Sequence, residues 1–385
     1  MRIAFYAPMK PPGHPLPSGD RQMARHFLAA LGQGGSAVDV ISTFRSYDGK
    51  GDPKRQDRIR VLGRRLADRI AGRHERRPQR EQPDAWFTYH LYHKAPDWLG
   101  PTVADRLSVP YVVAEASHAP KQLHGPWAGN CKAAAAAITR ADLVIGLNPG
   151  DAACVRPLLA NADCWLPLSP FIDTRPYDAA RSDRARNRHA LRSQYGLGGD
   201  EPVLLTVAMM RPGDKLHSYR HLADSLKHLL DRPWRLFVAG DGPARSEVLA
   251  ALEPLGNRLI DLGRQGDDTL PGIYTGADLF VWPAVNEAFG VSLMEAQAAG
   301  VPVIAMANDG VAGIVENGRT GLLVARDDTR AFAGAVRELL DDGPRRRALA
   351  TAAHRRAGRH HSIGAAAAVL APALARLVSV GRADR

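Results

Sequence analysis

The sequence of 385 residues has few cysteines, few aromatic residues and no long uninterrupted apolar run. Cys131, Cys154 and Cys164 are odd in number and lack Cys-x-x-Cys spacing, which favours free, buried thiols in a reducing compartment over a disulfide framework or a zinc site. The longest late apolar stretch, residues 362–375, contains Pro372 and is shorter than the roughly 20 residues that a membrane span needs. We therefore expect no helix that crosses a membrane.

The net charge of +11 is concentrated in one segment. Residues 54–80 hold eleven Lys and Arg against three acidic residues, and Ile59, Leu62, Leu66 and Ile70 recur there at helical spacing. Two interpretations remain open, a basic amphipathic helix on an anionic membrane surface and a solvated, mobile insertion. A nucleic-acid partner is disfavoured, because no zinc-finger spacing or aromatic–basic motif accompanies the charge.

Apolar, strand-like segments alternate with helical ones along the chain, a pattern typical of parallel sheets with helices on both faces. At 385 residues the chain exceeds the roughly 250–300 residues that one core serves. We predict an α/β protein of two Rossmann-like domains, 1–168 and 172–365, with 54–80 as an insertion in the first. Whether the final helix, 366–385, packs back onto the first domain is left open. Strands are predicted at residues 2–7, 38–43, 85–89, 110–114 and 142–146, and at 203–208, 235–239, 258–262, 278–282, 301–305 and 321–324.

The most specific motif follows the predicted strand at 278–282. Glu287 lies in the loop before a helix that Gly290 opens, and Glu295 lies more than a turn inside that helix. Amides at a helix start hold phosphate or hydroxyl oxygens, and carboxylates accept hydrogen bonds from sugar hydroxyls. Two glutamates near a helix start would, in isolation, mean only capping or compensation of the helix dipole.

A second candidate loop precedes the first helix of the amino-terminal half. Gly19 ends the Pro- and Gly-rich segment 8–20, where helix amides favour an anion, although such a loop is also an ordinary turn.

The run from Glu287 to Glu295 is followed by Gly300–Ile304 and Glu316–Val324, and it is preceded by Arg211, Lys215 and Gly240–Pro243. Together these motifs resemble the family 4 retaining glycosyltransferases of the GT-B fold, densely from about residue 200 to 340 and more weakly before it. The resemblance implies two facing Rossmann-like domains, 1–168 on the acceptor side and 172–365 on the nucleotide-sugar donor side, with a ligand cleft between them. The sequence departs from the family in having one glycine, Gly19, where two are usual, and Asp309–Gly313 where paired glycines are usual.

The resemblance implies a role for each of ten residues. The alternative for Arg211 and Lys215 is a pair of surface charges, and for the segment around His118 a polar turn, but the surrounding motif favours function for all three. Four residues are expected to be catalytic, namely His118 towards the donor sugar, Glu287 on its hydroxyls, and Arg211 and Lys215 on the diphosphate. Six are expected to bind the donor, namely Gly19 at the diphosphate, Arg264 at the nucleobase, the amides of Ala288, Phe289 and Gly290 at the sugar, and Glu295 at the ribose.

The function implied is retaining transfer of a sugar from a nucleotide-diphosphate donor, UDP- or GDP-linked, to a glycan, lipid-linked or small-molecule acceptor, as in polysaccharide assembly. No metal or cofactor is expected, because protein cations replace the metal in this fold and the sequence has no Asp-x-Asp triplet. The expected location is the cytoplasm, peripheral to the inner face of the membrane if 54–80 binds lipid. The alternative is a GT-B-fold nucleotide-sugar-binding protein, or a membrane-associated scaffold, without transfer activity.

Overall fold

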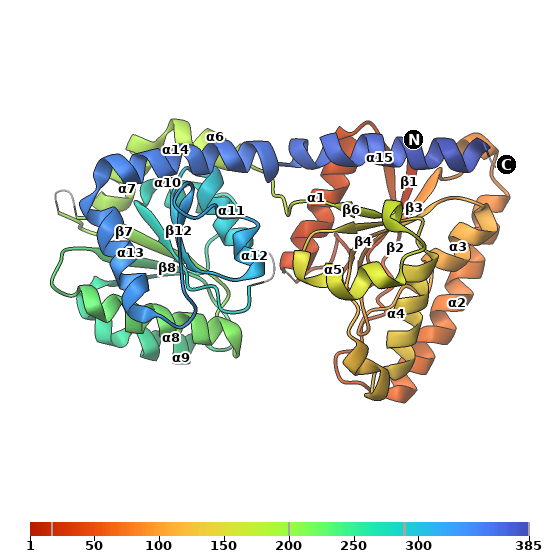
Figure 1. The fold of residues 1–385 in the computed structure, drawn as a ribbon, viewed down its shortest axis with the longest axis horizontal. Coiled ribbons are helices and arrows are strands. Elements are labelled where there is room, and N and C mark those ends of the chain that lie inside the picture. The colour runs from red at the N-terminus through yellow and green to blue at the C-terminus, as the bar shows by residue number, and fades with distance from the viewer. Residues whose placement is uncertain (17, 199–200, 288–289, 384–385) are drawn as a thin grey trace. The chain divides into compact units, whose positions relative to one another are not determined.

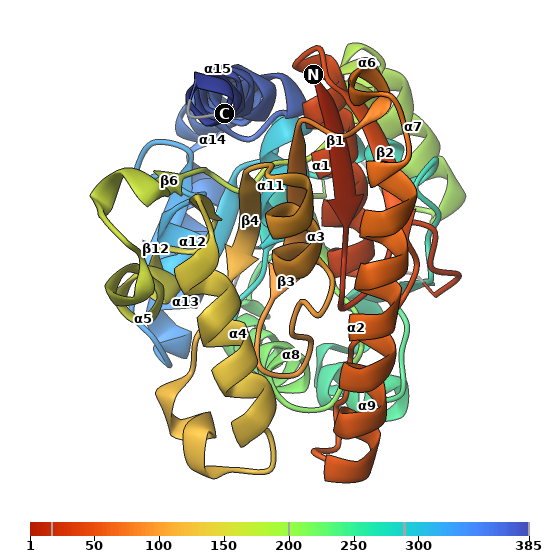
Figure 2. The same ribbon diagram turned by 90° about the vertical axis from the view of Figure 1, so that its right-hand side faces the viewer.

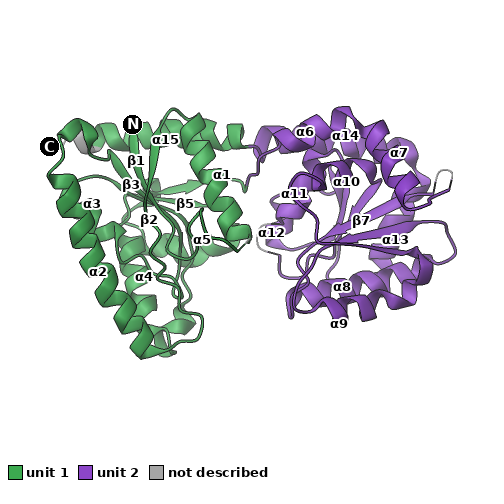
Figure 3. Cartoon of the chain, turned by 180° about the vertical axis from the view of Figure 1, so that it is seen from behind, with its two compact units in different colours: residues 1–170, 363–385 green, residues 171–362 purple. Residues whose placement is uncertain are grey.

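The computed structural model describes residues 1–385 except 17, 199–200, 288–289 and 384–385. The chain divides into two compact units, coloured separately in Figure 3. Unit 1 comprises Met1–Pro170 and Ile363–Arg385, and unit 2 comprises Phe171–Ser362. Each unit contains a six-stranded sheet (Figure 1), and every pair of neighbouring strands is parallel, which confirms the predicted pair of Rossmann-like folds.

The sheet of unit 1 has the order β2-β1-β3-β4-β5-β6, with strand order reversing between β1 and β3. Helices α1 and α15 lie side by side on one face, and α2, α3 and α4 lie on the other (Figures 1 and 2). The strands are β1 (Arg2–Tyr6), β2 (Ala37–Ser42), β3 (Ala85–Leu91), β4 (Tyr111–Ala116), β5 (Leu143–Gly146) and β6 (Trp165–Pro167). The helices are α1 (Gly19–Gln33), α2 (Pro53–Glu75), α3 (Gly100–Leu107), α4 (Ala128–Arg140), α5 (Pro149–Val155) and α15 (Ile363–Ala383), with short 3-10 turns η1 (Gln79–Glu81), η2 (Pro120–His124), η3 (Arg156–Leu158) and η4 (Ala162–Cys164).

The sheet of unit 2 has the order β12-β11-β10-β7-β8-β9. Helices α8, α9 and α13 cover one face, and α6, α7, α10, α11 and α14 cover the other (Figure 3). The strands are β7 (Val203–Val207), β8 (Arg235–Ala239), β9 (Leu259–Gly263), β10 (Leu279–Val281), β11 (Val303–Met306) and β12 (Gly321–Val324). The helices are α6 (Arg175–Ser182), α7 (Arg184–Gln194), α8 (Asp214–Leu226), α9 (Arg245–Leu252), α10 (Leu270–Gly276), α11 (Val291–Ala298), α12 (Asp309–Ala312), α13 (Thr329–Asp341) and α14 (Gly343–His360), with η5 (Lys227–Leu229) and η6 (Glu253–Arg258).

One strand, β6, falls outside the predicted set. It is three residues long, contains Pro167 and pairs only with β5 at the sheet edge, where a missing amide donor is tolerated. The ring of Trp165 lies so close to Gly146 that a Cβ there would come within 2.1 Å of it. A strand this short carries no alternating pattern that the sequence reveals.

The basic segment 54–80 is mostly helix α2, which connects β2 to β3 and packs against α3, so its interpretation as a mobile insertion was wrong. The buried face of α2 is formed by Gly63, Ala67, Ile70 and Ala71, whereas Leu62 is 50% exposed. The predicted apolar stripe was therefore displaced around the helix. The small residues are buried because the helix lies close to its neighbours, and a Cβ on Gly63 would come within 2.5 Å of Trp98.

One helix in the described part of the chain, α15, is long and apolar enough to cross a membrane by length and composition, against our expectation that none would be. The window Ile363–Val380 has a mean hydropathy of 1.9, because the apolar sequence resumes after Arg376. One third of this window is buried, on the stripe that includes Leu370 and Leu374. Helix α15 lies beside α1 in unit 1 (Figure 1).

Candidate functional site

The strongest cluster of predicted residues lies at the carboxyl edge of the unit 2 sheet, where doubly wound folds bind ligands. Lys215, in the first turn of α8, contacts Glu287, in the loop that follows β10, through Nζ and Oε2. The ammonium of Lys215 also lies 5.4 Å from the ring centroid of the buried Trp282. Both charged side chains keep some exposure, 24% for Lys215 and 14% for Glu287. The structure thus brings a cation and a carboxylate together in a partly buried position that remains open to a ligand.

The loop that carries Glu287 has a strained backbone. Ala284 and Asn286 both have left-handed conformations, with φ of 58° and 50°, which side chains other than glycine rarely adopt. Such strain costs on the order of 1–3 kcal/mol per residue and persists only where neighbouring contacts fix it.

Three side chains that sequence reasoning missed fix this loop. Ser218 accepts a hydrogen bond from the amide of Val285 at 3.0 Å, and Asp214 accepts one from the Asn286 side chain at 3.0 Å. Asn308, the N-cap of α12, donates to the carbonyl oxygen of Ala284 at 2.8 Å. The signal in the sequence was weak, since each is a small polar residue at a helix end or a helix face, as in most proteins.

Glu295 lies inside α11, and its carboxylate is held by tyrosines rather than by cations. Tyr274 donates its hydroxyl hydrogen to Oε2 at 2.8 Å, and Tyr177 supplies a second hydrogen bond. Burial raises the pKa of Glu295 to about 7, against the opposing effect of the two tyrosine hydroxyls. The carboxylate therefore retains acceptor capacity for further hydroxyl donors.

Arg211 lies in the loop after β7, with an exposed side chain. The Gly240–Gly242 turn after β8 supports this loop, and its glycines are required sterically. A Cβ on Gly240 would come within 2.1 Å of the carbonyl oxygen of Ala208, and one on Gly242 within 2.3 Å of that of Met210. The backbone amide of Met210 in turn donates to the backbone carbonyl oxygen of Asp241 at 3.0 Å.

The remaining predicted donor residues lie near the same edge. Arg264 follows β9 and is exposed. Gly290 caps α11 with φ of 53°, and a Cβ there would clash with Leu293 at 2.7 Å, so the site requires glycine. Ala288 and Phe289 lie outside the described residues.

His118 and Gly19 belong to unit 1, at the carboxyl edge of its own sheet. His118 follows β4, and burial lowers its pKa. Its Nδ1 is buried and has no hydrogen-bond partner among the described residues. Gly19 is exposed at the start of α1, where Ser18 accepts a hydrogen bond from the amide of Arg21 at 3.2 Å. No atom lies within 4 Å of the position of a Cβ on Gly19, so its own surroundings do not demand glycine.

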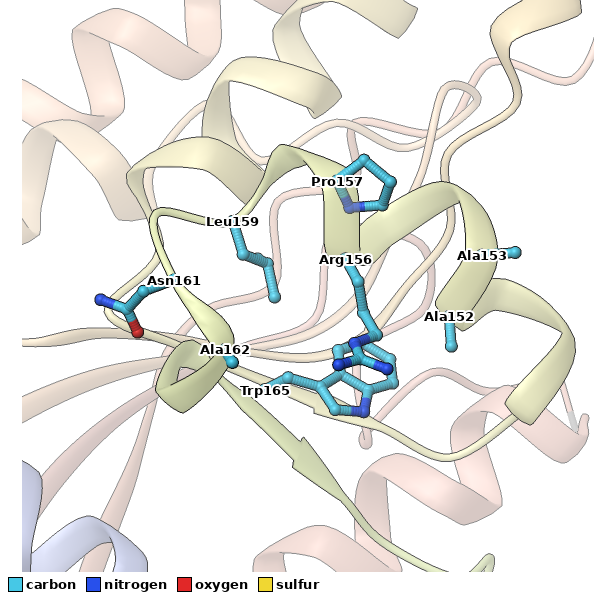
Figure 4. A pocket seen from close by; sticks show the side chains of 8 residues that line it. All are labelled: Ala152, Ala153, Arg156, Pro157, Leu159, Asn161, Ala162 and Trp165. Carbon is cyan, nitrogen blue, oxygen red and sulfur yellow. The ribbon is translucent and has the colours of Figure 1, made fainter.

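A separate cavity of about 540 Å³ lies beside β6 in unit 1 (Figure 4). Arg156, Leu159 and Trp165 line it, and none of the predicted site residues does. Within the described ranges, no group of three or more His, Cys, Asp or Glu side chains is arranged to hold a metal ion.

Comparison with known proteins finds sugar-transferring enzymes that are similar to part of the chain. Residues 187–356 match a family model described as glycosyl transferases group 1. A D-inositol 3-phosphate glycosyltransferase of Nocardia farcinica is 34% identical over 43% of this chain and 39% of its own length. A 2-deoxystreptamine glucosyltransferase of Streptomyces kanamyceticus is 31% identical over 44% of this chain and 46% of its own length. The matches thus span less than half of each of these relatives.

Solved structures extend the likeness to both units. A sucrose-phosphate synthase from Thermosynechococcus elongatus superposes with a TM-score of 0.71 over 98% of this chain and 99% of its own, at 20% identity. Anabaena HepE, solved in complex with UDP-glucose, superposes with a TM-score of 0.67 over 99% of this chain and 100% of its own, at 18% identity. At these identities the likeness establishes the fold, and it confirms the GT-B architecture that the sequence predicted.

Proposed function

We propose that this chain, whose residues 187–356 match the model of the group 1 glycosyl transferases, moves a sugar from a nucleotide-diphosphate donor to a hydroxyl of an acceptor. The observation that carries the proposal is the contact between Lys215 and Glu287 at the carboxyl edge of the unit 2 sheet. A carboxylate accepts hydrogen bonds from sugar hydroxyls, and a neighbouring ammonium attracts diphosphate oxygens. The pair therefore suits the junction between sugar and diphosphate in such a donor.

In this proposal each predicted residue contacts either the charged diphosphate or a hydroxyl group of the donor. Lys215 and Arg211 stabilise the negative charge that develops on the departing nucleoside diphosphate. Glu287 holds the sugar hydroxyls, and the Gly290 amide supports it at the start of α11. Glu295, held by Tyr274, accepts hydrogen bonds from the ribose.

Further assignments complete the proposal. Arg264 contacts the nucleobase, Gly19 approaches the diphosphate, His118 projects towards the donor sugar, and the Ala288 and Phe289 amides bind that sugar. The chemistry is of the family 4 type, with retained anomeric configuration, no metal and no cofactor, and with a UDP- or GDP-linked donor. The relatives are named for a phosphorylated inositol and for an aminocyclitol, so their names leave the acceptor class open between an anion and a cation. Glycan and lipid-linked acceptors remain part of the proposal.

A thermal-shift panel of UDP, GDP and their sugar conjugates tests the donor site, with EDTA and then with Mg²⁺. A ligand that binds only the folded state raises its melting temperature, so we expect a shift with one nucleotide that EDTA does not abolish. A shift that requires Mg²⁺ would disprove metal independence. Absence of a shift with any nucleotide, on folded protein, would remove the transfer function and favour the scaffold alternative. Proton NMR of the product with the donor so identified reports the anomeric configuration.

Two variants and one control locate the donor in this panel. Lys215→Ala is expected to weaken binding of the nucleoside diphosphate by roughly 10–100-fold, since charge-assisted hydrogen bonds contribute about 1.5–3 kcal/mol. Glu295→Ala is expected to weaken it by about 1–3 kcal/mol, through lost ribose contacts. Lys227→Ala is the matched control, because Lys227 is exposed and, among the residues that the structure describes, forms an ion pair only with Asp224, at 2.9 Å. Equal effects of Lys215→Ala and Lys227→Ala would refute the assignment.

We also propose that α2 binds the anionic inner face of the membrane, which would make a cytoplasmic enzyme peripheral. Its arginines Arg58, Arg65 and Arg69 are exposed, and no ion-pair partner lies within 4 Å of them among the residues that the structure describes. Leu62 stands exposed beside them. Each basic residue near an anionic surface contributes about 1 kcal/mol.

Vesicle sedimentation tests this contact. Vesicles that contain about 30% anionic phospholipid should bind the protein and sediment with it, whereas purely zwitterionic vesicles should not. Added salt should release the protein from the anionic vesicles. The double variant Arg65→Glu and Arg69→Glu should abolish retention, whereas Arg347→Glu, in α14 of unit 2, should not. Retention unaffected by the double variant would show that α2 is not the contact.

A further inference from the structure

Unit 1 contains a cluster of one histidine and three carboxylates that the proposed function does not use. Asp20 lies in the first turn of α1, His90 near the end of β3, Glu115 near the end of β4, and Asp151 in the first turn of α5. All four come from the carboxyl edge of the same parallel sheet. Nδ1 of His90 lies 3.0 Å from Oδ1 of Asp20, and Ser117 supplies a hydrogen bond to Asp151.

Glu115 distinguishes this cluster from a set of surface acids. It is 9% exposed, and its Oε2 is buried without a hydrogen-bond partner among the described residues. An unsatisfied buried polar group costs about 1–3 kcal/mol. Helix-dipole compensation accounts for Asp20 and Asp151, which lie in first turns, but it does not account for Glu115 within a strand.

The backbone under the cluster is strained at the two strand positions. His90 and Glu115 have φ of 64° and 60°, left-handed values in otherwise extended strands. Each such residue costs on the order of 1–3 kcal/mol. Glu115 thus combines backbone strain, burial and an oxygen without a hydrogen-bond partner among the described residues, and all three lower stability. This combination points to a ligand that compensates for the cost.

The electrostatics of the cluster favour a cation. Burial raises the pKa of Glu115 to about 8, with the carboxylates of Asp151 and Asp20 adding to the effect and His90 opposing it. Burial lowers the pKa of His90, but its proximity to Asp20 and to the other two carboxylates outweighs burial and leaves it raised. Protonated His90 balances Asp20, which leaves Glu115 and Asp151 without an opposing charge from the cluster when ionised.

An aromatic row adjoins the cluster. From His90 it continues through Tyr92, His93 and Trp127, with ring centroids 5.0, 5.2 and 5.7 Å apart in turn. Lys94 lies 5.0 Å from the Trp127 centroid, so the far end of the row is basic while the His90 end is acidic. Aromatic faces suit both the C–H groups of a cyclic polyol and a bound cation.

We propose that this edge of unit 1 binds the acceptor by a protonated amine, and that the acceptor is an amine-bearing cyclic polyol. The inference rests on the proposed transfer function and selects a cationic acceptor over a phosphorylated one. The ammonium is held by Glu115 and Asp151, and the ring lies against Tyr92. On binding, the carboxyl group of Glu115 loses its proton to solvent and becomes a carboxylate paired with the ammonium, so up to one proton is released per amine bound.

Isothermal titration calorimetry of the full chain tests the acceptor class with three six-membered carbocycles, 2-deoxystreptamine, myo-inositol and inositol 3-phosphate. We expect 2-deoxystreptamine to bind at least about tenfold more tightly than either of the others, the factor that one charge-assisted contact of about 1.4 kcal/mol supplies. Titrations at pH 7 in buffers of different ionisation enthalpy should show proton release. Equal or tighter binding of myo-inositol or its phosphate would overturn the inference, as would heat from MgCl₂ alone that competes with the amine.

Variants separate this inference from a structural role of the cluster. Glu115→Gln should weaken amine binding about tenfold or more and abolish the buffer-dependent heat. Asp151→Asn should weaken binding but retain proton release, and it serves if Glu115→Gln fails to fold. Lys121→Gln is the control with unchanged amine binding, since Lys121 is exposed on η2 near the basic end. Unchanged amine affinity in both Glu115→Gln and Asp151→Asn would refute the site.

Failure of this inference is distinguishable from failure of the transfer function. The same samples are assayed for the nucleotide-dependent thermal shift of unit 2. A nucleotide shift without preferential amine binding leaves the transfer function intact and refutes the acceptor class. Amine binding without any nucleotide shift refutes the transfer function, and with it the identification of the amine as an acceptor.

Discussion

At the scale of single residues, the same side chain has different chemistry according to its surroundings. Glu287 lies against an ammonium and Glu295 against tyrosine hydroxyls, whereas Oε2 of Glu115 has no hydrogen-bond partner among the described residues. Burial raises the pKa of Glu295 to about 7 and that of Glu115 to about 8. Glu115, which has an oxygen without a partner among the described residues, is therefore the glutamate to which we assign an external cation.

The raised pKa of Glu115 predicts a specific dependence of stability on pH. Because the unfolded carboxyl group loses its proton near pH 4.5 and the folded one near pH 8, the native state binds more protons between these values. The stabilising contribution is complete below about pH 4.5 and is lost as the pH rises through about 8. Glu115→Gln lacks this dependence on pH. Its free energy of unfolding, relative to that of the wild type, should therefore rise by roughly 2–4 kcal/mol from pH 5 to pH 9.

Urea unfolding of the two proteins at pH 5 and pH 9 measures the difference. Glu247→Gln, an exposed substitution in α9, is the control and should show none. A constant gap between wild type and Glu115→Gln across this range would show that Glu115 ionises normally in the folded protein.

At the scale of elements, two loops at the carboxyl edge of unit 2 depend on each other through glycine. The loop after β8 lies against the carbonyl groups of the loop after β7. Arg211 belongs to the loop after β7 and follows Met210 directly. The strained loop after β10 is fixed instead by hydrogen bonds with the side chains of Ser218 and Asn308. Rigid neighbours thus position residues that the loops alone would not hold.

Gly240→Ala is expected to displace the loop that carries Arg211. The added Cβ would come within 2.1 Å of the Ala208 carbonyl oxygen, a backbone atom that cannot rotate away. We expect a loss of about 1–3 kcal/mol in stability and weaker binding of the nucleoside diphosphate. Thermal unfolding and the nucleotide thermal shift measure the two effects.

The matched control is Gly334→Ala in α13, where no atom lies within 4 Å of the added Cβ. It should stabilise the protein by about 0.5–1 kcal/mol, because alanine is the better helix former. A Gly240→Ala protein as stable as the wild type would show that the two loops can separate without cost.

At the scale of the whole molecule, the chain leaves unit 1 after Pro170 and re-enters it at Ile363. Helix α15 completes one face of unit 1 by packing on α1, so the core of this unit depends on residues nearly two hundred positions from the rest of it. Leu370 and Leu374 of this helix are each 1% exposed. Packing on unit 1 thus accounts for part of the apolar character of α15, the most apolar helix among the described residues.

Leu374→Ala is expected to destabilise unit 1 by about 2–4 kcal/mol, as for other large-to-small core substitutions. Val380→Ala, on the same helix at a position 56% exposed, should change stability by no more than about 0.5 kcal/mol. Thermal unfolding, read with and without nucleotide, compares them. If both variants unfolded alike, α15 would not be held by its apolar stripe.

The sequence by itself determined the features that depend on local pattern. Alternating apolar segments predicted both parallel sheets, because strand and turn preferences act over a few residues. The run from Glu287 to Glu295 carries a resemblance to the family 4 glycosyltransferases. Only the tertiary structure decided which side chains meet. The contact of Lys215 with Glu287, the tyrosines around Glu295 and the buried face of α2 join positions far apart in sequence or depend on how closely helices pack. The role of Glu115 likewise arises from neighbours on three other elements, and burial, which sets its pKa, is a property of the folded chain alone.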